Sequence, residues 1–438
     1  MRIVVRCQEP QAARRAQERL AAAGVEATAL PGPPATRRNA PNGEDILIVD
    51  GAADGLVAAT AFAEAARASE HPPLAILAAL SADAPPPSGL ESPHCFDGAI
   101  SLEAPPALLA AQISALTRMS VASEERVRRI ATAGAMRTAT PKPLEPRKLK
   151  ALYIGAPSPI FLSLERALAQ HNGLVCAAFT SFAGFDHLHD EFFDAVVLNG
   201  AADSATAISL CAALRRNTSL HHVPTMVVTA PGDSATATSA IDRGASAVVA
   251  MDAPSAPALG WLFEAIRRER RRKAAEHDIR ALRDIMGDPR TGLFRRAPFE
   301  SHLARLADDH HASGRSLSLA ALRVMPAHGS TEPSPQVWKR GFTEIASLSG
   351  RLLRDTDTAT ALNGDLIVVA LPATDMQGAR RLAERVASVA ECTAFAAGEG
   401  DAGPVVFEQS IAELQPGESG TGLMARALRV FQQQSVTA

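Results

Sequence analysis

The chain has 438 residues, with 44 lysines and arginines against 47 aspartates and glutamates and a formal net charge of −3. This length suits about three domains of ordinary size, and the near balance of charge excludes a global attraction to nucleic acid or to an anionic membrane. The five cysteines are scattered and lack a Cys-x-x-Cys spacing, which argues against a disulfide framework and a zinc site. Neither a signal peptide nor a membrane span of ~18 apolar residues is found in the sequence, so we expect a cytoplasmic protein.

Residues 1–120 alternate short apolar runs with alanine-rich helical stretches. The runs predicted as strands are 3–5, 46–49, 74–77 and 99–102. Strands that alternate with helices are typical of a parallel α/β sheet. Residues 148–270 repeat the pattern, with predicted strands at 149–154, 195–198, 225–229 and 247–251. Because the pattern occurs twice, we predict an internal duplication of one fold.

Two segments join these regions to each other and to the rest of the chain. Residues 121–147 are predicted as a linker because Thr138–Pro146 contains three prolines and no apolar periodicity, although Glu124–Arg129 could prolong a helix. Residues 271–287 are predicted as a connecting helix. The basic run Arg267–Lys273 includes a glutamate and no aromatic residue, which favours a solvated helix face over a nucleic-acid site.

The two α/β regions share the position of one polar residue. Asp50 follows the third-strand run of the first region, and Asn199 occupies the matching place in the second. Both regions resemble response-regulator receiver domains, which have a flavodoxin-like (CheY-like) fold and use a phosphoacceptor aspartate that needs a bound magnesium ion. Cys7 and Gln8 replace the acidic pair that would hold the metal in the first region. We therefore favour a structural carboxylate for Asp50 over a phosphoacceptor. The resemblance also implies a homodimer formed through the receiver domains.

Residues 288–438 carry two short motifs within the predicted order helix, strand, helix, hairpin, helix. Asp288–Phe299 reads Asp-Pro-Arg-Thr-Gly-Leu-Phe-Arg-Arg-Ala-Pro-Phe, and Asn363–Ile367 reads Asn-Gly-Asp-Leu-Ile before an apolar strand. Nine residues before that turn, Arg354 and Asp357 form an Arg-x-x-Asp pair. These motifs resemble the GGDEF domain of the diguanylate cyclase family. The resemblance implies a degenerate, nucleotidyl-cyclase-like α/β domain over 288–438.

The synthetic chemistry of that family is not expected in this chain. Such cyclases bind GTP and two metal ions through carboxylates on the first core strand and in the hairpin turn. Arg323 and Met325 stand at the strand positions, and Leu366 and Ile367 replace the acidic and aromatic residues of the turn. Asn363 replaces a glycine that lets the backbone approach the nucleotide. We therefore expect no enzyme activity and no metal requirement, with a divergent cyclase as the alternative.

The product-inhibition site of the family is matched without a gap. Arg354 and Asp357 are accompanied by Arg381 and Arg385, which lie four residues apart on a predicted helix and therefore share one face. An arginine fork pairs with guanine O6 and N7 or bridges a phosphate. A carboxylate can accept from guanine N1–H and N2–H, which arginine cannot do. The resemblance implies that these four residues bind cyclic di-GMP, as a stacked dimer in the family.

The order receiver, receiver, GGDEF, together with the losses above, resembles non-catalytic members of the family. That resemblance implies a cyclic di-GMP effector that is recruited to a cell pole and acts as an adaptor in cell-cycle proteolysis. The implied protein partners are RcdA and the ClpXP protease. The two rival interpretations are a divergent cyclase that makes cyclic di-GMP from GTP and a phosphorylation-controlled receiver protein that acts through Asp50.

Overall fold

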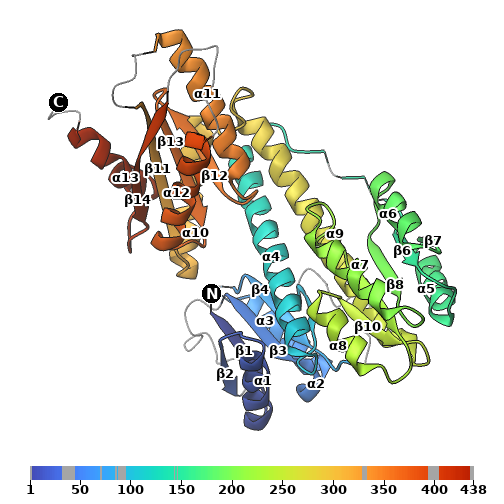
Figure 1. Ribbon diagram of the computed structural model, residues 1–438. Coiled ribbons are helices and arrows are strands. Elements are labelled where there is room, and N and C mark those ends of the chain that lie inside the picture. Colours follow the sequence, from blue (N-terminus) through green and yellow to red (C-terminus); the bar gives the residue numbers. More distant parts are fainter. Residues whose placement is uncertain are drawn as a thin grey trace. The chain divides into compact units, whose positions relative to one another are not determined.

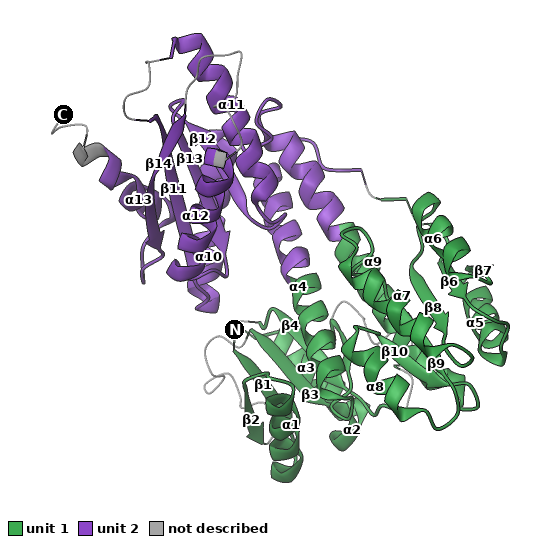
Figure 2. Cartoon of the chain, in the orientation of Figure 1, with its two compact units in different colours: residues 1–120, 144–274 green, residues 121–143, 275–438 purple. Residues whose placement is uncertain are grey.

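The computed structural model describes residues 2–31, 45–69, 72–83, 86, 95–142, 144–145, 147–327, 333–392 and 404–434. The chain divides into two compact units (Figure 2). Unit 1 contains residues 1–120 and 144–274, and unit 2 contains residues 121–143 and 275–438. Within the described ranges, every helix is too short or too polar to cross a membrane.

The first half of unit 1 is built on a five-stranded parallel sheet with the strand order β2-β1-β3-β4-β5 (Figure 1). The strands are β1 (Ile3–Cys7), β2 (Ala27–Pro31), β3 (Ile46–Asp50), β4 (Ala75–Ala79) and β5 (Gly98–Ile100). The helices are α1 (Pro10–Ala22), α2 (Gly51–Asp54), α3 (Leu56–Arg67) and α4 (Pro106–Ala135), which continues into unit 2. β1, β3 and β4 are buried at every position, as expected for a parallel sheet that helices cover on both faces.

The second half of unit 1 repeats this architecture. Its parallel sheet has the strand order β10-β9-β8-β6-β7, which is the same topology read from the opposite edge. The strands are β6 (Lys150–Ile154), β7 (Leu174–Ala178), β8 (Ala195–Asn199), β9 (Thr225–Thr229) and β10 (Ala247–Ala250). The helices are α5 (Pro159–Gln170), α6 (Ser181–Asp190), α7 (Ser204–Arg216), α8 (Ser234–Asp242) and α9 (Ser255–Met286). The repeated order 2-1-3-4-5 is the flavodoxin-like topology, which confirms the predicted duplication.

Helix α9 also packs against the first sheet of unit 1. The buried carboxylate of Glu264 accepts a hydrogen bond from the backbone N–H of Ala99 at 3.2 Å. A Cβ atom at Gly98 would lie 2.5 Å from Leu116 Cδ2 and 2.7 Å from Glu264 Oε1. A side chain at position 98 would therefore displace the ends of the Leu116 and Glu264 side chains.

Unit 2 contains a four-stranded antiparallel sheet with the order β12-β13-β11-β14. The strands are β11 (Leu317–Pro326), β12 (Thr358–Leu362), β13 (Leu366–Pro372) and β14 (Val405–Glu413). The remaining helices are α10 (Arg296–Ser313), α11 (Pro335–Leu352), α12 (Met376–Cys392) and α13 (Gly420–Gln434). Two flavodoxin-like domains are thus followed by a third α/β domain, as predicted.

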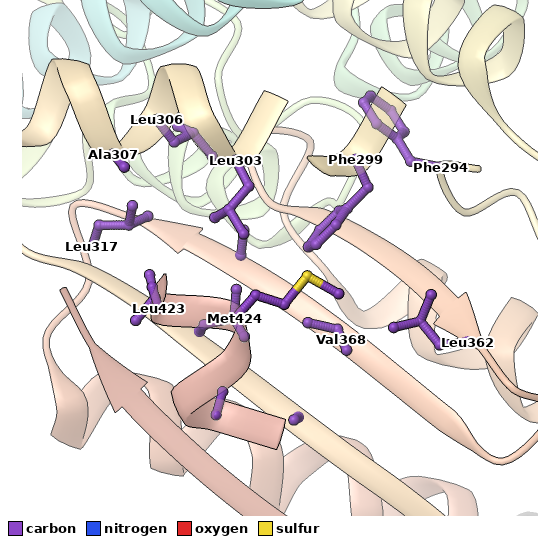
Figure 3. Close-up of a cluster of buried hydrophobic side chains, with 14 of the residues drawn as sticks. Phe294, Phe299, Leu303, Leu306, Ala307, Leu317, Leu362, Val368, Leu423 and Met424 are labelled. Atoms are coloured by element: carbon purple, nitrogen blue, oxygen red, sulfur yellow. The ribbon is translucent and has the colours of Figure 1, made fainter. Parts of the chain in front are cut away.

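Two apolar clusters lie on the two faces of this sheet. In the first, Phe299 and Leu303 of α10 and Met424 of α13 pack against strand residues that include Val368 (Figure 3). Helices α11 and α12 supply the second cluster on the opposite face. The chain passes directly from α11 to the edge strand β12, which places residues 353–357 at one end of the sheet.

The structure corrects the expected linker over 121–147. Residues 121–135 form the second part of α4 and belong to unit 2, where Ala133 joins the first apolar cluster. Glu125 and Arg129 on this part of α4 are each only 1% exposed. Because much of the buried face is charged, the sequence lacks the apolar periodicity that identifies a packed helix. The third domain therefore includes a chain segment well before residue 288.

Candidate functional site

The Arg-x-x-Asp motif forms a tight turn between α11 and β12. The backbone N–H of Arg354 donates to Asp357 Oδ2 at 2.9 Å, and the N–H of Asp357 donates to Arg354 O at 3.0 Å. The three-residue spacing is therefore set by an aspartate side chain that closes its own turn. The side chain of Asp357 is buried, whereas Arg354 is exposed.

Burial raises the pKa of Asp357 to about 6, because the carboxylate loses hydration. The hydrogen bond from Arg354 and the charge of that residue oppose the shift. Glu125 adds to the shift through its negative charge, and Arg129 opposes it. At pH 7 the Asp357 carboxylate is mostly ionised and can accept hydrogen bonds from a ligand.

The two arginines predicted on α12 differ in their relation to this turn. Arg381 and Arg385 are one helical turn apart and both are exposed. Nη2 of Arg385 donates to the carbonyl oxygen of Leu352 at 2.9 Å, so Arg385 reaches the segment directly before Arg354. The side chain of Arg381 makes no hydrogen bond or ion pair to another residue that the structure describes. Its membership of the same site remains a prediction.

A cavity of about 270 Å³ lies beside the turn, between α11 and the loop that follows α9. The arginines that line the cavity are Arg283, Arg290, Arg351 and Arg354. The carboxylates that line it are Asp355 and Asp357, whereas Arg381 and Arg385 lie outside it. Arg283 and Arg290 were not predicted as site residues, because they are far from the turn in sequence and no local spacing identifies them.

The arginines around the cavity differ in whether their side chains pair with a carboxylate. Arg290 pairs with Asp288 at 2.9 Å, and Arg283 lies 4.0 Å from Asp355. Arg351 and Arg354 make no side-chain hydrogen bond or ion pair to any other described residue. Two guanidinium groups are therefore available at the cavity, and four arginines against two carboxylates favour an anionic ligand.

The hairpin turn after β12 contains two residues in the left-handed backbone conformation. Leu362 pairs with Leu366, and Asn363 and Gly364 in the loop between them have φ angles of 55° and 83°. Asparagine is one of the few residues other than glycine that adopts this left-handed conformation routinely. Asparagine at position 363 is therefore compatible with this turn and presents a side chain there.

The guanidinium of Arg323 lies near two carboxylates. Arg323 Nε lies 3.4 Å from Asp365 Oδ2, and Arg323 Nη1 lies 4.0 Å from Glu408 Oε2. The indole N–H of Trp338 donates to the carbonyl oxygen of Gly364 at 3.0 Å, which places this ring against the turn. Across the described part of the chain, no group of three or more His, Cys, Asp or Glu side chains is arranged to hold a metal ion.

Asp50 in unit 1 is engaged in local structure. Its Oδ1 accepts from the backbone N–H groups of Ala52 and Ala53 at 3.1 and 3.0 Å, which caps α2. The thiol of Cys7 donates to Oδ2 at 3.5 Å, and burial together with the charge of Asp50 raises the pKa of Cys7 to about 12. These contacts account for a structural carboxylate at position 50, and phosphorylation there remains a prediction.

The sequence matches no family model, and no curated protein matches it either. Among solved structures, the chain is similar to the GGDEF domain of DgcB from Caulobacter crescentus in complex with c-di-GMP, at 20% identity over 35% of this chain and 92% of that chain, with a TM-score of 0.29. It is similar to the diguanylate cyclase SiaD from Pseudomonas aeruginosa at 24% identity over 41% of this chain and 70% of that one, with a TM-score of 0.31. A candidate response regulator from Chloroflexus aurantiacus matches at 16% identity over 28% of this chain and 99% of that one, with a TM-score of 0.26. At these identities and scores the matches carry no inference about ligands.

Proposed function

We propose that this chain is a non-catalytic effector that binds cyclic di-GMP at the Arg-x-x-Asp turn. The observation that carries the proposal is an exposed Arg354 guanidinium beside the buried Asp357 carboxyl group on the wall of an arginine-rich cavity. The guanidinium can donate to guanine O6 and N7, and the carboxylate can accept from guanine N1–H and N2–H. Arg351 can neutralise a phosphate of the ligand.

Isothermal titration calorimetry with cyclic di-GMP is expected to show binding to the wild-type chain. The Arg354→Ala variant should bind about tenfold more weakly or worse, because one good arginine–guanine contact contributes ~1–3 kcal/mol. Arg340→Ala is a control, since Arg340 is exposed like Arg354 but lies on α11, pairs with Glu344 and does not line the cavity. Absence of binding by the wild type, or equal affinity of the two variants, would overturn the proposal.

The same titration tests whether the two arginines of α12, Arg381 and Arg385, contribute to ligand binding. Arg385→Ala is expected to weaken binding, because Arg385 reaches the end of α11. Arg381→Ala decides whether the second predicted arginine contributes. Unchanged affinity in both variants would restrict the site to the cavity beside Arg354.

We also propose that the chain does not synthesise cyclic di-GMP. The support is the Arg323 guanidinium between Asp365 and Glu408, because a metal ion bound there would have to displace a charge of its own sign. Purified chain with GTP and magnesium should give no cyclic di-GMP on anion-exchange chromatography, while an active cyclase added to the same reaction should. Product from the chain alone would establish the divergent-cyclase interpretation.

The domain order resembles PleD, a receiver-receiver-GGDEF cyclase, and the lost and retained motifs together resemble its non-catalytic paralogue PopA. On that resemblance we extend the proposal to a cytoplasmic adaptor of cell-cycle proteolysis, dimeric through its receiver domains and recruited to a cell pole. RcdA and ClpXP are the partners that the resemblance implies. Co-purification of RcdA with the chain, with and without cyclic di-GMP, tests this extension.

A further inference from the structure

A buried arginine outside the predicted site holds the Arg-x-x-Asp turn. Arg129 lies on the part of α4 that belongs to unit 2. Its Nη2 donates to the carbonyl oxygens of Asp355 at 2.8 Å and of Asp357 at 3.0 Å. Its Nη1 donates to the carbonyl oxygen of Ile279 on α9 at 3.0 Å. One guanidinium therefore fixes two carbonyl groups of the turn and joins the turn to a neighbouring helix.

The orientation of Arg129 is itself fixed from several sides. Nε donates to Glu125 Oε1 at 2.7 Å, and the same carboxylate oxygen lies 3.0 Å from His302 Nε2. The guanidinium carbon lies 5.3 Å from the centre of the Phe294 ring, within range of a cation–π contact. The backbone N–H of Phe294 in turn donates to the carbonyl oxygen of Ala359 on β12. These contacts hold the arginine in one geometry before any ligand arrives.

We propose that Arg129 is a positioning residue of the cyclic di-GMP site, which keeps Arg354 and Asp357 in the geometry that reads one guanine edge. This inference rests on the proposed function. A turn that is already ordered loses less conformational entropy on binding than one that the ligand must order. Without Arg129, two carbonyl groups of the turn lose a charged hydrogen-bond donor. The turn must then become ordered when the ligand binds, which weakens the affinity.

Two variants separate this role from a general loss of stability. Arg129→Met removes the donors to the turn. Arg128→Met is the matched control, because Arg128 is also buried on α4 and also pairs with Glu125 at 2.7 Å, but its other partners are Glu124 and Asp309 rather than the turn. By calorimetry, Arg129→Met should bind cyclic di-GMP about tenfold more weakly or worse, and Arg128→Met within about threefold of wild type. Equal losses in both variants, or none in Arg129→Met, would overturn the proposal.

A ligand-free measurement keeps this proposal distinguishable from the proposed function. The amide hydrogens of Arg354 and Asp357 are both hydrogen-bonded within the turn. Their exchange with solvent should be at least about tenfold faster in Arg129→Met than in Arg128→Met, because exchange reports local opening. If wild type does not bind cyclic di-GMP, the proposed function fails while this exchange experiment still decides the role of Arg129. Equal exchange in the two variants would contradict the positioning role.

A pH profile provides a readout that a purely structural role would not change. The charged groups that act on Asp357 are Arg354 on its own turn and Arg129 and Glu125 on α4. Asp357 also lines the same cavity as Arg283 of α9 and Arg351 of α11. Loss of the positive charge at residue 129 raises the pKa of Asp357. The pH at which the affinity for cyclic di-GMP is half-maximal should therefore increase in Arg129→Met and stay unchanged in Arg128→Met. If Arg129→Met fails to fold, Arg129→Lys decides, since it keeps the charge but has no fork to bridge two carbonyl groups. Wild-type affinity in Arg129→Lys would then overturn the proposal.

Discussion

Replacement of Glu125 by alanine is expected to lower the free energy of unfolding of unit 2 by about 3–5 kcal/mol, the range for breaking a buried ion pair. Glu125 Oε1 lies 2.7 Å from Arg129 Nε, and Oε2 lies 2.7 Å from Arg128 Nη1. Burial alone would raise the pKa of Glu125, but His302 and the two arginines hold it below its usual range. Glu125→Ala removes one negative charge from the surroundings of two buried guanidinium groups. This loss determines how far the free energy of unfolding falls.

The chain offers a matched control for this prediction. Arg296 and Glu300 have the same four-residue spacing and the same 2.7 Å distance, but their side chains are 67% and 44% exposed. Glu300→Ala should therefore cost less than about 1 kcal/mol. Urea unfolding can follow unit 2 alone, because Trp261→Phe leaves Trp338 as the reporter in that unit. Equal losses in the two alanine variants would show that burial does not determine the effect.

The stability of unit 2 is also expected to depend on pH through two buried groups with opposite effects. His310 Nδ1 lies 2.7 Å from the carbonyl oxygen of Leu306, and His310 Nε2 lies 3.2 Å from the backbone nitrogen of Ala373. These contacts require a neutral ring that donates from Nδ1 and accepts at Nε2. Burial lowers the pKa of His310 to about 4, whereas burial raises that of Asp357 to about 6.

The sign of each contribution follows from the unfolded chain, in which histidine and aspartate titrate near pH 6.5 and 3.8. The contribution of His310 is present above pH 6.5 and is lost as the pH falls through about 4. The contribution of Asp357 is present below pH 3.8 and is lost as the pH rises through about 6. Each amounts to roughly 3 kcal/mol, from about 1.4 kcal/mol per pKa unit. The two therefore nearly cancel in the wild type between pH 4 and 6.5.

Single variants should reveal the two hidden contributions. Relative to wild type, Asp357→Asn should lose about 3 kcal/mol of stability as the pH falls from 6.5 to 4, because only the histidine contribution remains. His310→Gln should gain a similar amount over the same range. Urea unfolding at several pH values, with Trp338 as the reporter, measures both. Parallel pH curves for the wild type and the two variants would contradict the assignment.

Most strands of the two parallel sheets could be predicted from the sequence, including the edge strands β5 and β10, whereas the edge strands β2 and β7 could not. The predicted strand at 225–229 coincides with β9, and the run at 46–49 lies within β3. Strands β2 and β7 were not predicted, and both are partly exposed. β2 (Ala-Thr-Ala-Leu-Pro) has no continuous apolar run to identify it, whereas β7 (Leu-Val-Cys-Ala-Ala) has one that was not recognised as a strand.

In the site, residues that are close in sequence could be predicted together, whereas residues that are distant in sequence could not. Arg354 and Asp357 could be recognised as a pair because one short turn sets their spacing. Arg129 and Arg283 reach the turn from helices that are remote in sequence, and no periodicity joins them to it. Because many of residues 121–135 are charged, their sequence predicted a linker rather than a buried helix. The contributions of Arg381 and Arg385 remain predictions.

The chain passes between the two units three times, at residues 120–121, 143–144 and 274–275. The second flavodoxin-like domain is thus an insertion between two segments of unit 2. During synthesis, residues 121–143 leave the ribosome before any of their partners from residue 275 onward, so Arg129 stays without its contacts to Ile279 and to the turn until the C-terminal part emerges. A gene segment for residues 288–438 would encode the Arg-x-x-Asp turn without the arginine that holds it. The whole of unit 2 could therefore be transferred to another protein in one block only together with the inserted residues 144–274.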